Sequence, residues 1–404
     1  MSNEIIGPLT GNDMIGNRAN AVGPAMSEHF RLSYNARRIL AILRVQGPQS
    51  RVEIARLLDI TPSTVTRLTG SLIKDGMLGE ASDPSREGQK GYPAKLLYIE
   101  PGGVITAGVY VDPDRIMTCL SDLTGTVLSS ESVAVPDRSF VAMMTMAGES
   151  VRRQVQALGL AGWRVAGCGV SYPGQYSEDP TRVMRIRQFQ DWPAVNVTRD
   201  LRPYFGMPVH HMNDAKAACL AELYHGACTG TRNFCHIWLS YGIGGAAVVD
   251  QRPYFGRNNG AAEWGGLFPK SQPRPSGQDL LDTLTAAGVA IDKLSDIADH
   301  HLEMAVVTEW RDRAAKQLQW LCLVIARTYA PEAIVIGGTL HPQLIEGFLD
   351  VIRAVPQLGE DFVTTPPRLL RAARDNLPQL GAAALPLHHL MNPATYAGHA
   401  VKGL

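Results

Sequence analysis

The amino-acid sequence predicts an α/β protein, in which an N-terminal winged helix-turn-helix precedes a larger body of two α/β lobes. Three short helical periods follow one another over residues 35–74, and a hairpin pattern continues from them to residue 100. Beyond that point, runs rich in Val, Ile and Gly alternate with helical stretches for about 300 residues, which is typical of an α/β fold. We therefore divide the chain into a loose tail at 1–30, a winged helix-turn-helix at 31–100 and a two-lobed body at 101–404.

Charge is distributed unevenly along the chain. The 38 Lys and Arg residues balance the 38 Asp and Glu residues overall, but residues 31–95 contain eleven Lys or Arg and only six Asp or Glu. A locally basic segment suits a polyanion as partner, although surface charge often serves only solubility.

Two further features concern the compartment. Residues 1–30 lack the charged and apolar segments of a signal peptide, and no apolar run approaches the ~18 residues that span a bilayer. We therefore expect a cytoplasmic protein without a membrane partner. The six cysteines include no C-x-x-C pair, which predicts buried, reduced thiols rather than disulfides or a metal site.

The three predicted helices have recognisable ends. The first runs over 35–47 and stops at Gly47. The second opens with Ser50 and Glu53 in capping-box spacing and ends near Asp59. The third has Thr61 as its expected N-cap and Pro62 at its first helical position, where a missing N–H does no harm.

The third helix has one apolar and one polar face. Val65, Leu68 and Leu72 form the apolar stripe, while small, polar and basic side chains occupy the opposite face. In a helix-turn-helix such a helix enters the DNA major groove; a small three-helix packing module is the alternative. The candidate DNA-contacting residues on this helix are Ser63, Thr64, Thr66, Arg67 and Ser71.

A predicted β-hairpin wing follows the third helix. Residues 77–100 contain two strand-like pieces around a tip rich in Gly, Lys and Pro. Arg86, Lys90 and Lys95 would lie near phosphates or a minor groove. Lys90 and Tyr92 are the candidate DNA-contacting residues of the tip.

The body begins with three predicted strands over 103–135, joined by turns at Pro113-Asp114 and Thr124-Gly125. Residues 164–176 then read as a buried strand that ends in a loop, and 208–227 as a strand that leads into a helix. Residues 234–256 read as a hairpin with a glycine-rich turn.

The strongest candidate site in the body combines Asn213 and Asp214, at the strand-to-helix transition, with Glu263 in "NNGAAEWGG". Carboxylates and amides accept from and donate to vicinal hydroxyls, so this set suits a polyhydroxylated ligand. The alternative is that the Asp only caps the helix. The turn "YGIGG" (241–245) could approach a phosphate but is weak support by itself.

The order of these motifs resembles the ROK family, named for repressors, open reading frames and sugar kinases, in its repressor form. The resemblance covers roughly residues 33–390 and implies a winged helix joined to an actin-like, sugar-kinase-like ATPase body. It also implies a ligand site at Gly174, Asn213, Asp214 and Glu263. The motifs are "SDLTGTVL" (121–128), "GCGVSYPGQY" (167–176), "MNDAKAACLAELYHGA" (212–227), "LSYGIGGAAVVDQ" (239–251), "GRNNGAAEWGG" (256–266) and "PEAIVIGGTL" (331–340).

The chain departs from this family at both phosphate loops. In family kinases the residue that matches Asp214 is the catalytic base, but the first phosphate loop, Asp-x-Gly-x-Thr, is absent at 111–115. In the second loop, Tyr241 replaces a small hydroxyl residue. Phosphoryl transfer depends on positioning the phosphates and stabilising their charge, so we expect no enzymatic activity and no cofactor. Asp214 would be catalytic only if the chain were a kinase.

A second departure concerns metal and the wing. Gly266 stands where the family's zinc-binding histidine occurs, and the family's cysteine cluster does not follow, so we expect no metal. The family's Gly-Arg-Pro wing tip reads Gly91-Tyr92-Pro93 here.

These observations favour a DNA-binding transcriptional regulator, specifically a repressor, that responds to a sugar or polyol. The expected partners are a double-stranded DNA operator, this effector and a second copy of the chain in a homodimer or higher homo-oligomer, because paired recognition helices read paired half-sites. An ATP-dependent sugar kinase with an accessory DNA-binding domain is the alternative. A body that has lost ligand binding and only mediates dimerisation is the third hypothesis.

Overall fold

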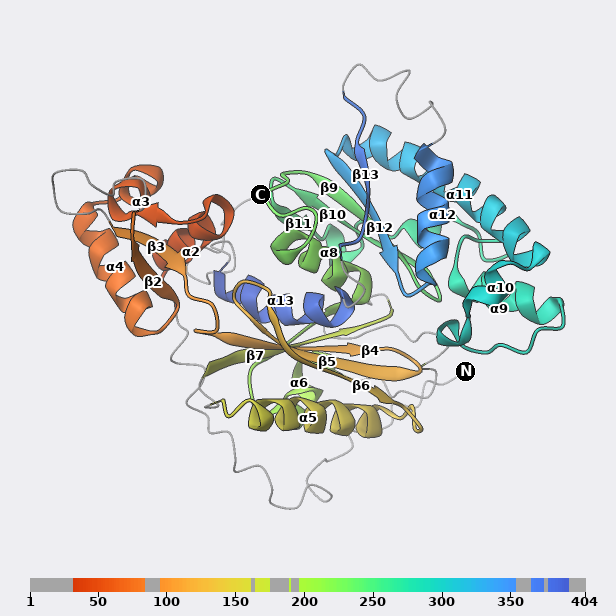
Figure 1. Ribbon diagram of the computed structural model, residues 1–404, viewed down its shortest axis with the longest axis horizontal. Helices are drawn as coiled ribbons and strands as arrows, with labels where there is room; N and C mark the ends of the chain where they lie inside the picture. Colours follow the sequence, from red (N-terminus) through yellow and green to blue (C-terminus); the bar gives the residue numbers. More distant parts are fainter. Residues whose placement is uncertain are drawn as a thin grey trace, which may run out of the picture.

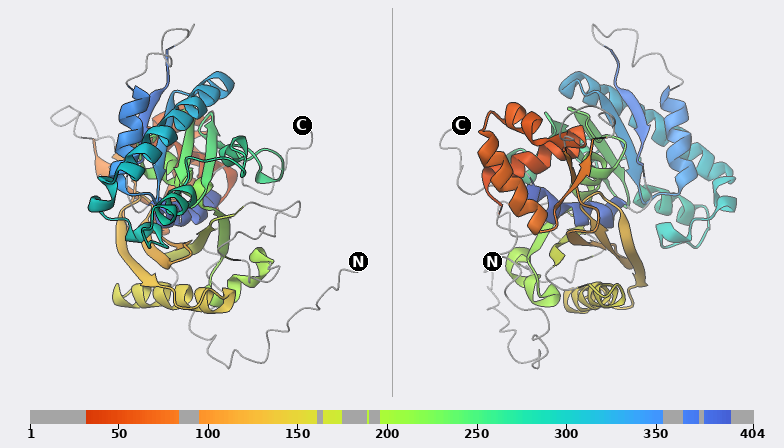
Figure 2. Two further views of the ribbon diagram at one scale, coloured as in Figure 1. Left: turned by 90° about the vertical axis from the view of Figure 1, so that its right-hand side faces the viewer. Right: turned by 60° about the vertical axis from the view of Figure 1, so that its left-hand side comes forward.

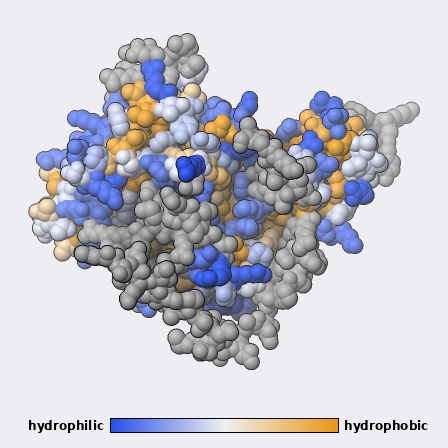
Figure 3. Space-filling view, turned by 180° about the vertical axis from the view of Figure 1, so that it is seen from behind, coloured by the Kyte–Doolittle hydropathy of each residue, from blue (hydrophilic) through white to orange (hydrophobic). Residues whose placement is uncertain are grey.

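The computed structural model describes residues 32–83, 95–160, 164–174, 189, 196–353, 365–373 and 377–391. A winged helix-turn-helix opens this part of the chain and projects from the rest of the molecule (Figures 1 and 3). Its strand β1 was not expected from the sequence and pairs with β3, so that β3 lies between β1 and β2. The elements are α2 (Tyr34–Gln46), β1 (Gln49–Ser50), α3 (Arg51–Leu58), α4 (Pro62–Lys74), β2 (Leu78–Ser82) and β3 (Lys95–Ile99).

Local capping explains where these helices begin. The Thr61 side chain accepts a hydrogen bond from the Thr64 N–H, and Pro62 occupies the first helical position of α4, as predicted. Ser50 caps α3 by accepting from the Glu53 N–H. The predicted helix starts are therefore confirmed, whereas Arg86, Lys90 and Tyr92 of the wing tip lie outside the described residues.

The body contains two five-stranded sheets with one topology. In each sheet an antiparallel three-stranded meander is followed by two parallel strands on the other side of its first strand, in the orders β6-β5-β4-β7-β8 and β11-β10-β9-β12-β13. The first sheet consists of β4 (Ile105–Val111), β5 (Arg115–Asp122), β6 (Val127–Ala134), β7 (Val165–Tyr172) and β8 (Val209–Asn213). The second consists of β9 (Phe234–Leu239), β10 (Ile243–Val249), β11 (Arg252–Tyr254), β12 (Ala333–Gly338) and β13 (Arg368–Arg371). The two-lobed body is confirmed, and the lobes repeat a topology that the sequence did not reveal.

Other helices cover the outer faces of the sheets (Figure 1). The first lobe carries α5 (Phe140–Ala157) with the short helices α6 (Val197–Asp200) and α7 (Arg202–Phe205). The second lobe carries α9 (Gly277–Ala286), α10 (Asp299–Leu302), α11 (Ala305–Tyr329) and α12 (Pro342–Arg353). No helix among the described residues is long and apolar enough to cross a membrane. All six cysteines are buried and free, as predicted.

Two helices lie between the lobes. Helix α8 (Asp214–His225) leaves the first sheet but packs against β9 and β10 of the second, and α13 (Leu377–Met391) leaves the second sheet but packs against β4 and β7 of the first. The two helices also contact each other so closely that a Cβ on Gly381 of α13 would lie 2.0 Å from the Ala217 carbonyl oxygen of α8. Each lobe thus contributes one helix that packs against the sheet of the other lobe, and this close-packed pair joins the lobes (Figures 1 and 2).

Candidate functional site

The candidate ligand site lies where β8 ends and α8 begins. Asn213 is the N-cap of α8, and its Oδ1 accepts from the N–H groups of Ala215 and Lys216 at 3.0 and 3.3 Å. Its Nδ2 donates to the Gly174 carbonyl at 2.7 Å, which ties this cap to the loop after β7. Asn213 therefore caps the helix, and the alternative in which Asp214 only serves as this cap is wrong.

Asp214 is the first residue of α8 and is almost fully buried. Its Oδ1 accepts from the Ala215 N–H at 2.9 Å. Burial raises the pKa of Asp214 to about 6, and the nearby Asp112 carboxylate contributes to this rise. Burial likewise raises the pKa of Asp112, at the end of β4, to about 6. A carboxylate that is held in the charged form against this cost is typical of functional sites.

Glu263 reaches the same helix from the second lobe. Its Oε1 lies 2.8 Å from Nζ of Lys216, whose side chain is only 3% exposed, whereas the Glu263 side chain is 29% exposed. The structure thus brings the four predicted residues, Gly174, Asn213, Asp214 and Glu263, around the start of α8. Lys216 was missed, because nothing in its local sequence shows that a lysine two residues after Asp214 is buried beside a residue far along the chain.

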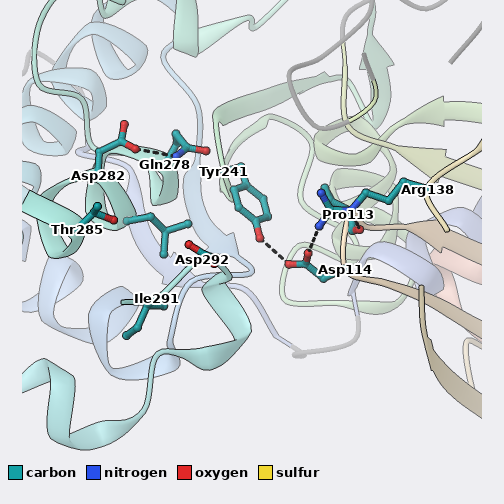
Figure 4. Close-up of a pocket in the computed structure, with 10 residues that line it drawn as sticks. Pro113, Asp114, Arg138, Tyr241, Gln278, Asp282, Thr285, Ile291 and Asp292 are labelled. Carbon is teal, nitrogen blue, oxygen red and sulfur yellow. Dashed lines mark hydrogen bonds and ion pairs between the residues drawn. The ribbon is translucent and has the colours of Figure 1, made fainter. Parts of the chain in front are cut away.

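The turn between β4 and β5 and the turn between β9 and β10 face each other across the lobes (Figure 4). The Tyr241 hydroxyl, from the turn between β9 and β10, donates to Asp114 Oδ2 at 2.5 Å, and Asp114 Oδ1 pairs with Arg138 at 2.9 Å. Asp112 Oδ1 accepts from the Asp114 N–H at 3.0 Å within the β4–β5 turn. The turn between β4 and β5 therefore presents two carboxylates, one of which holds the phenol of the opposite lobe.

A polar pocket of 420 Å³ adjoins this contact. Asp114 and Arg138 come from the first lobe, and Tyr241, Asp282 and Asp292 come from the second (Figure 4). Three carboxylates with one arginine make this pocket a poor host for phosphate groups. No group of three His, Cys, Asp or Glu residues within the described ranges has the arrangement of a metal site.

The candidate DNA-contacting face of α4 is open to solvent. Ser63, Thr66, Arg67 and Ser71 are exposed and Thr64 is half-buried, while the apolar stripe packs inward. The hydroxyls of Thr66 and Thr69 donate hydrogen bonds to backbone carbonyls of α4, and Arg67 is exposed on the helix surface. The helix therefore presents short polar groups around Arg67, and Lys74 is exposed two turns further along α4.

Comparisons with known proteins agree with both parts of this architecture. A model of the ROK family matches residues 106–389, and a model of winged helix-turn-helix DNA-binding domains matches residues 32–78. The chain is 32% identical over 358 residues to the uncharacterized protein y4fQ of Sinorhizobium fredii, covering 87% of this chain and 88% of that protein. It is 21% identical over 384 residues to the xylose repressor of Bacillus subtilis, covering 91% and 98%.

Among solved structures, a ROK family transcriptional regulator described as a homolog of E. coli Mlc superposes with a TM-score of 0.65 at 18% identity, covering 89% of this chain and 97% of that one. This likeness supports the fold, from the winged helix through both lobes.

Proposed function

The chain belongs to the ROK family, and from that premise we propose that it is a DNA-binding transcriptional repressor of carbohydrate uptake or catabolism genes, controlled by a sugar or polyol between its lobes. The observation that carries this proposal is the pairing of a solvent-exposed recognition face on α4 with a body that gathers Asn213, Asp214 and Glu263. The alignment with the xylose repressor of Bacillus subtilis spans 91% of this chain, so it includes both the winged helix-turn-helix and the body.

The chemistry of the site favours a hydroxyl-rich ligand. Asp214 supplies a desolvated carboxylate, and the half-exposed Glu263 supplies a second that Lys216 orients. Carboxylates accept charge-assisted hydrogen bonds from adjacent hydroxyls, which are stronger than bonds between neutral groups. We propose Gly174, Asn213, Asp214 and Glu263 as the residues that bind the effector.

The alternative function is an ATP-dependent sugar kinase, and the specific observation in its favour is Asp214, whose pKa near 6 suits a general base. Against it, the Tyr241 phenol and the Asp112 and Asp114 carboxylates occupy the two loops that would have to stabilise phosphate charge. We therefore propose that the chain has no kinase activity. Sugar-dependent formation of ADP that is lost in Asp214→Ala would overturn this view.

To test the proposed function, the protein is first used to select its target from fragmented genomic DNA. Binding of the protein to this selected DNA is then measured at one fixed salt concentration, with and without candidate sugars. D-xylose, other monosaccharides, polyols and their phosphates form the panel. We expect at least one to change the dissociation constant for DNA, because an effector shifts a binding equilibrium by its different affinity for two states. A panel without any effect would reject effector control, and the absence of selected DNA would reject the regulator itself.

Arg67→Ala is expected to weaken binding to the selected DNA by about 1–3 kcal/mol, because a guanidinium on the recognition face can contact a base edge. Binding to unrelated DNA should change less, so the ratio of specific to non-specific affinity is the quantity to measure. Arg153→Ala, which removes the same charge from α5 on the far face of the first lobe, is the control. Equal losses of affinity for the selected and the unrelated DNA would mean that Arg67 contacts phosphates rather than a base edge.

We also propose that the protein acts as a homodimer or higher homo-oligomer. Two recognition helices would then read half-sites about one helical turn apart, and the selected DNA should show a repeated or palindromic pattern at that spacing.

A further inference from the structure

The winged helix-turn-helix is seated on the two helices that join the lobes. Arg44, in the last turn of α2, donates from Nη1 to the Leu223 carbonyl at 3.4 Å, and its guanidinium carbon lies 4.4 Å from the centre of the Tyr224 ring. Leu223 and Tyr224 belong to the last turn of α8, where carbonyls lack partners within the helix and carry partial negative charge. The Arg44 guanidinium therefore makes two favourable interactions, one with the face of the aromatic ring and one with the partial negative charge of the helix C-terminus.

Helix α13 takes part in the same junction. The Tyr224 hydroxyl lies 2.9 Å from Nδ1 of His388, and Arg37 of α2 donates to the His389 carbonyl. One continuous hydrophobic core contains Leu43 of α2 together with Leu223 of α8 and Leu390 of α13. The DNA-binding domain therefore contacts the ends of both interlobe helices directly and is not merely tethered to the body by the chain.

The other end of α8 is the proposed ligand site. Asn213 caps the helix there, Asp214 is its first residue, and Lys216 connects it to Glu263 of the second lobe. The helix has 12 residues, so its ends are about 18 Å apart. Every residue from Asp214 to Tyr224 is buried. A short helix that is packed on all sides moves as a unit with its neighbours rather than bending.

We propose that α8 transmits the state of the ligand site to the DNA-binding domain, with Lys216 as the positioning residue at its input end and Arg44 and Tyr224 at its output end. The inference rests on the proposed function for its biological meaning but not for its test. A change in how Glu263 and Lys216 hold α8 against the second lobe shifts the last turn of α8 against α2. The setting of α4 relative to the body changes with it.

The test breaks the ion pair between Lys216 and Glu263, at the input end of α8, in the absence of any sugar. Lys216→Met keeps the length and volume of the buried side chain but removes its ion pair with Glu263. Glu263→Gln removes the same ion pair from the half-exposed side. In the full-length protein, we expect both variants to change the rate of amide hydrogen exchange in α2 by threefold or more. We expect the dissociation constant for selected DNA to change by a similar factor.

Breaking the output end should abolish that response. In an Arg44→Met background, adding Lys216→Met should leave α2 exchange and DNA affinity within twofold of the background. Arg153→Met, which removes a guanidinium from α5 far from the junction, should preserve the full response. Thermal unfolding of each variant shows whether it has kept its fold. If Lys216→Met does not fold, Glu263→Gln still breaks the same ion pair.

Unchanged α2 exchange in both input variants, or an equal response with and without Arg44, would overturn the inference. The exchange measurement needs neither operator nor effector, so its result stands even where the DNA titrations contradict the proposed function. Conversely, a sugar that regulates DNA binding equally well in the Arg44→Met protein would reject α8 as the coupling element while confirming effector control.

Discussion

Asp214→Asn is expected to weaken effector binding by about 10- to 100-fold and, at the same time, to stabilise the protein. The loss follows from replacing a carboxylate by a neutral amide, since hydrogen bonds to charged groups contribute about 1.5–3 kcal/mol. The gain follows from the raised pKa: an aspartate with a folded pKa of about 6 and an unfolded value of 3.8 pays for its charge at every pH above 6. That cost corresponds to about 2–3 kcal/mol and disappears in the amide.

The measurement combines sugar titration by calorimetry with urea unfolding at pH 7.5. Asp122→Asn is the matched control, because Asp122 is also buried and also accepts from backbone N–H groups, but at the opposite end of the same sheet. It should leave sugar affinity unchanged. An Asp214→Asn protein that binds sugar normally, or that is less stable than the wild type, would show that Asp214 is a structural carboxylate.

Features set by neighbouring residues could be predicted from the sequence. Thr61 and Pro62 fix the start of α4 because a cap and its N–H partner are only three residues apart. The same holds for the turns of the first sheet and for the strand that leads into α8, because apolar periodicity and turn residues act within a few positions. The residue chemistry of Asn213, Asp214 and Glu263 suggested one site for a polyhydroxylated ligand, and the family resemblance implied the same site with Gly174 added.

Features set by contacts between distant segments could not be predicted. The short strand β1 forms only because β3, almost fifty residues later, offers it an edge. The Lys216–Glu263 pair, the Tyr241–Asp114 hydrogen bond and the Arg44–Tyr224 contact each join residues that no local pattern relates. The alternative in which Asp214 only caps the helix was wrong: both Asn and Asp are good N-caps, and only the backbone geometry shows that Asn213 is the cap.

Contacts between distant segments also limit which residues the β9–β10 hairpin can hold. At Gly244 and Gly245, a side chain would meet the Cβ of Ala215 and the ring of Trp264. Tyr241, in contrast, points across to the first lobe, where its hydroxyl donates a hydrogen bond to Asp114. The glycines of this hairpin therefore allow close packing against Ala215 and Trp264, while Tyr241 of the same hairpin connects the two lobes.

His388→Gln is expected to make the protein markedly less sensitive to acid. Burial, together with His389 and Arg44, lowers the pKa of His388 to about 3, against about 6.5 for an exposed histidine. Burial also raises the pKa of Tyr224 to about 12, so the phenol is the donor and neutral Nδ1 of His388 the acceptor. Protonation of the imidazole would remove this acceptor and place a cation beside Arg44.

The sign follows from proton linkage. The stabilisation associated with a folded pKa below the unfolded one is complete above pH 6.5 and is lost progressively as the pH falls from 6.5 towards 3. Between pH 7.5 and 5 the wild type should therefore lose about 2 kcal/mol more free energy of unfolding than His388→Gln. Glutamine does not titrate and its amide oxygen can still accept from the Tyr224 hydroxyl. Comparing the two proteins cancels the opposite contribution of Asp112 and Asp214, whose raised pKa values favour the folded state at low pH. Equal pH dependence in urea unfolding would mean that His388 is hydrated and that the junction between α2, α8 and α13 opens before it titrates.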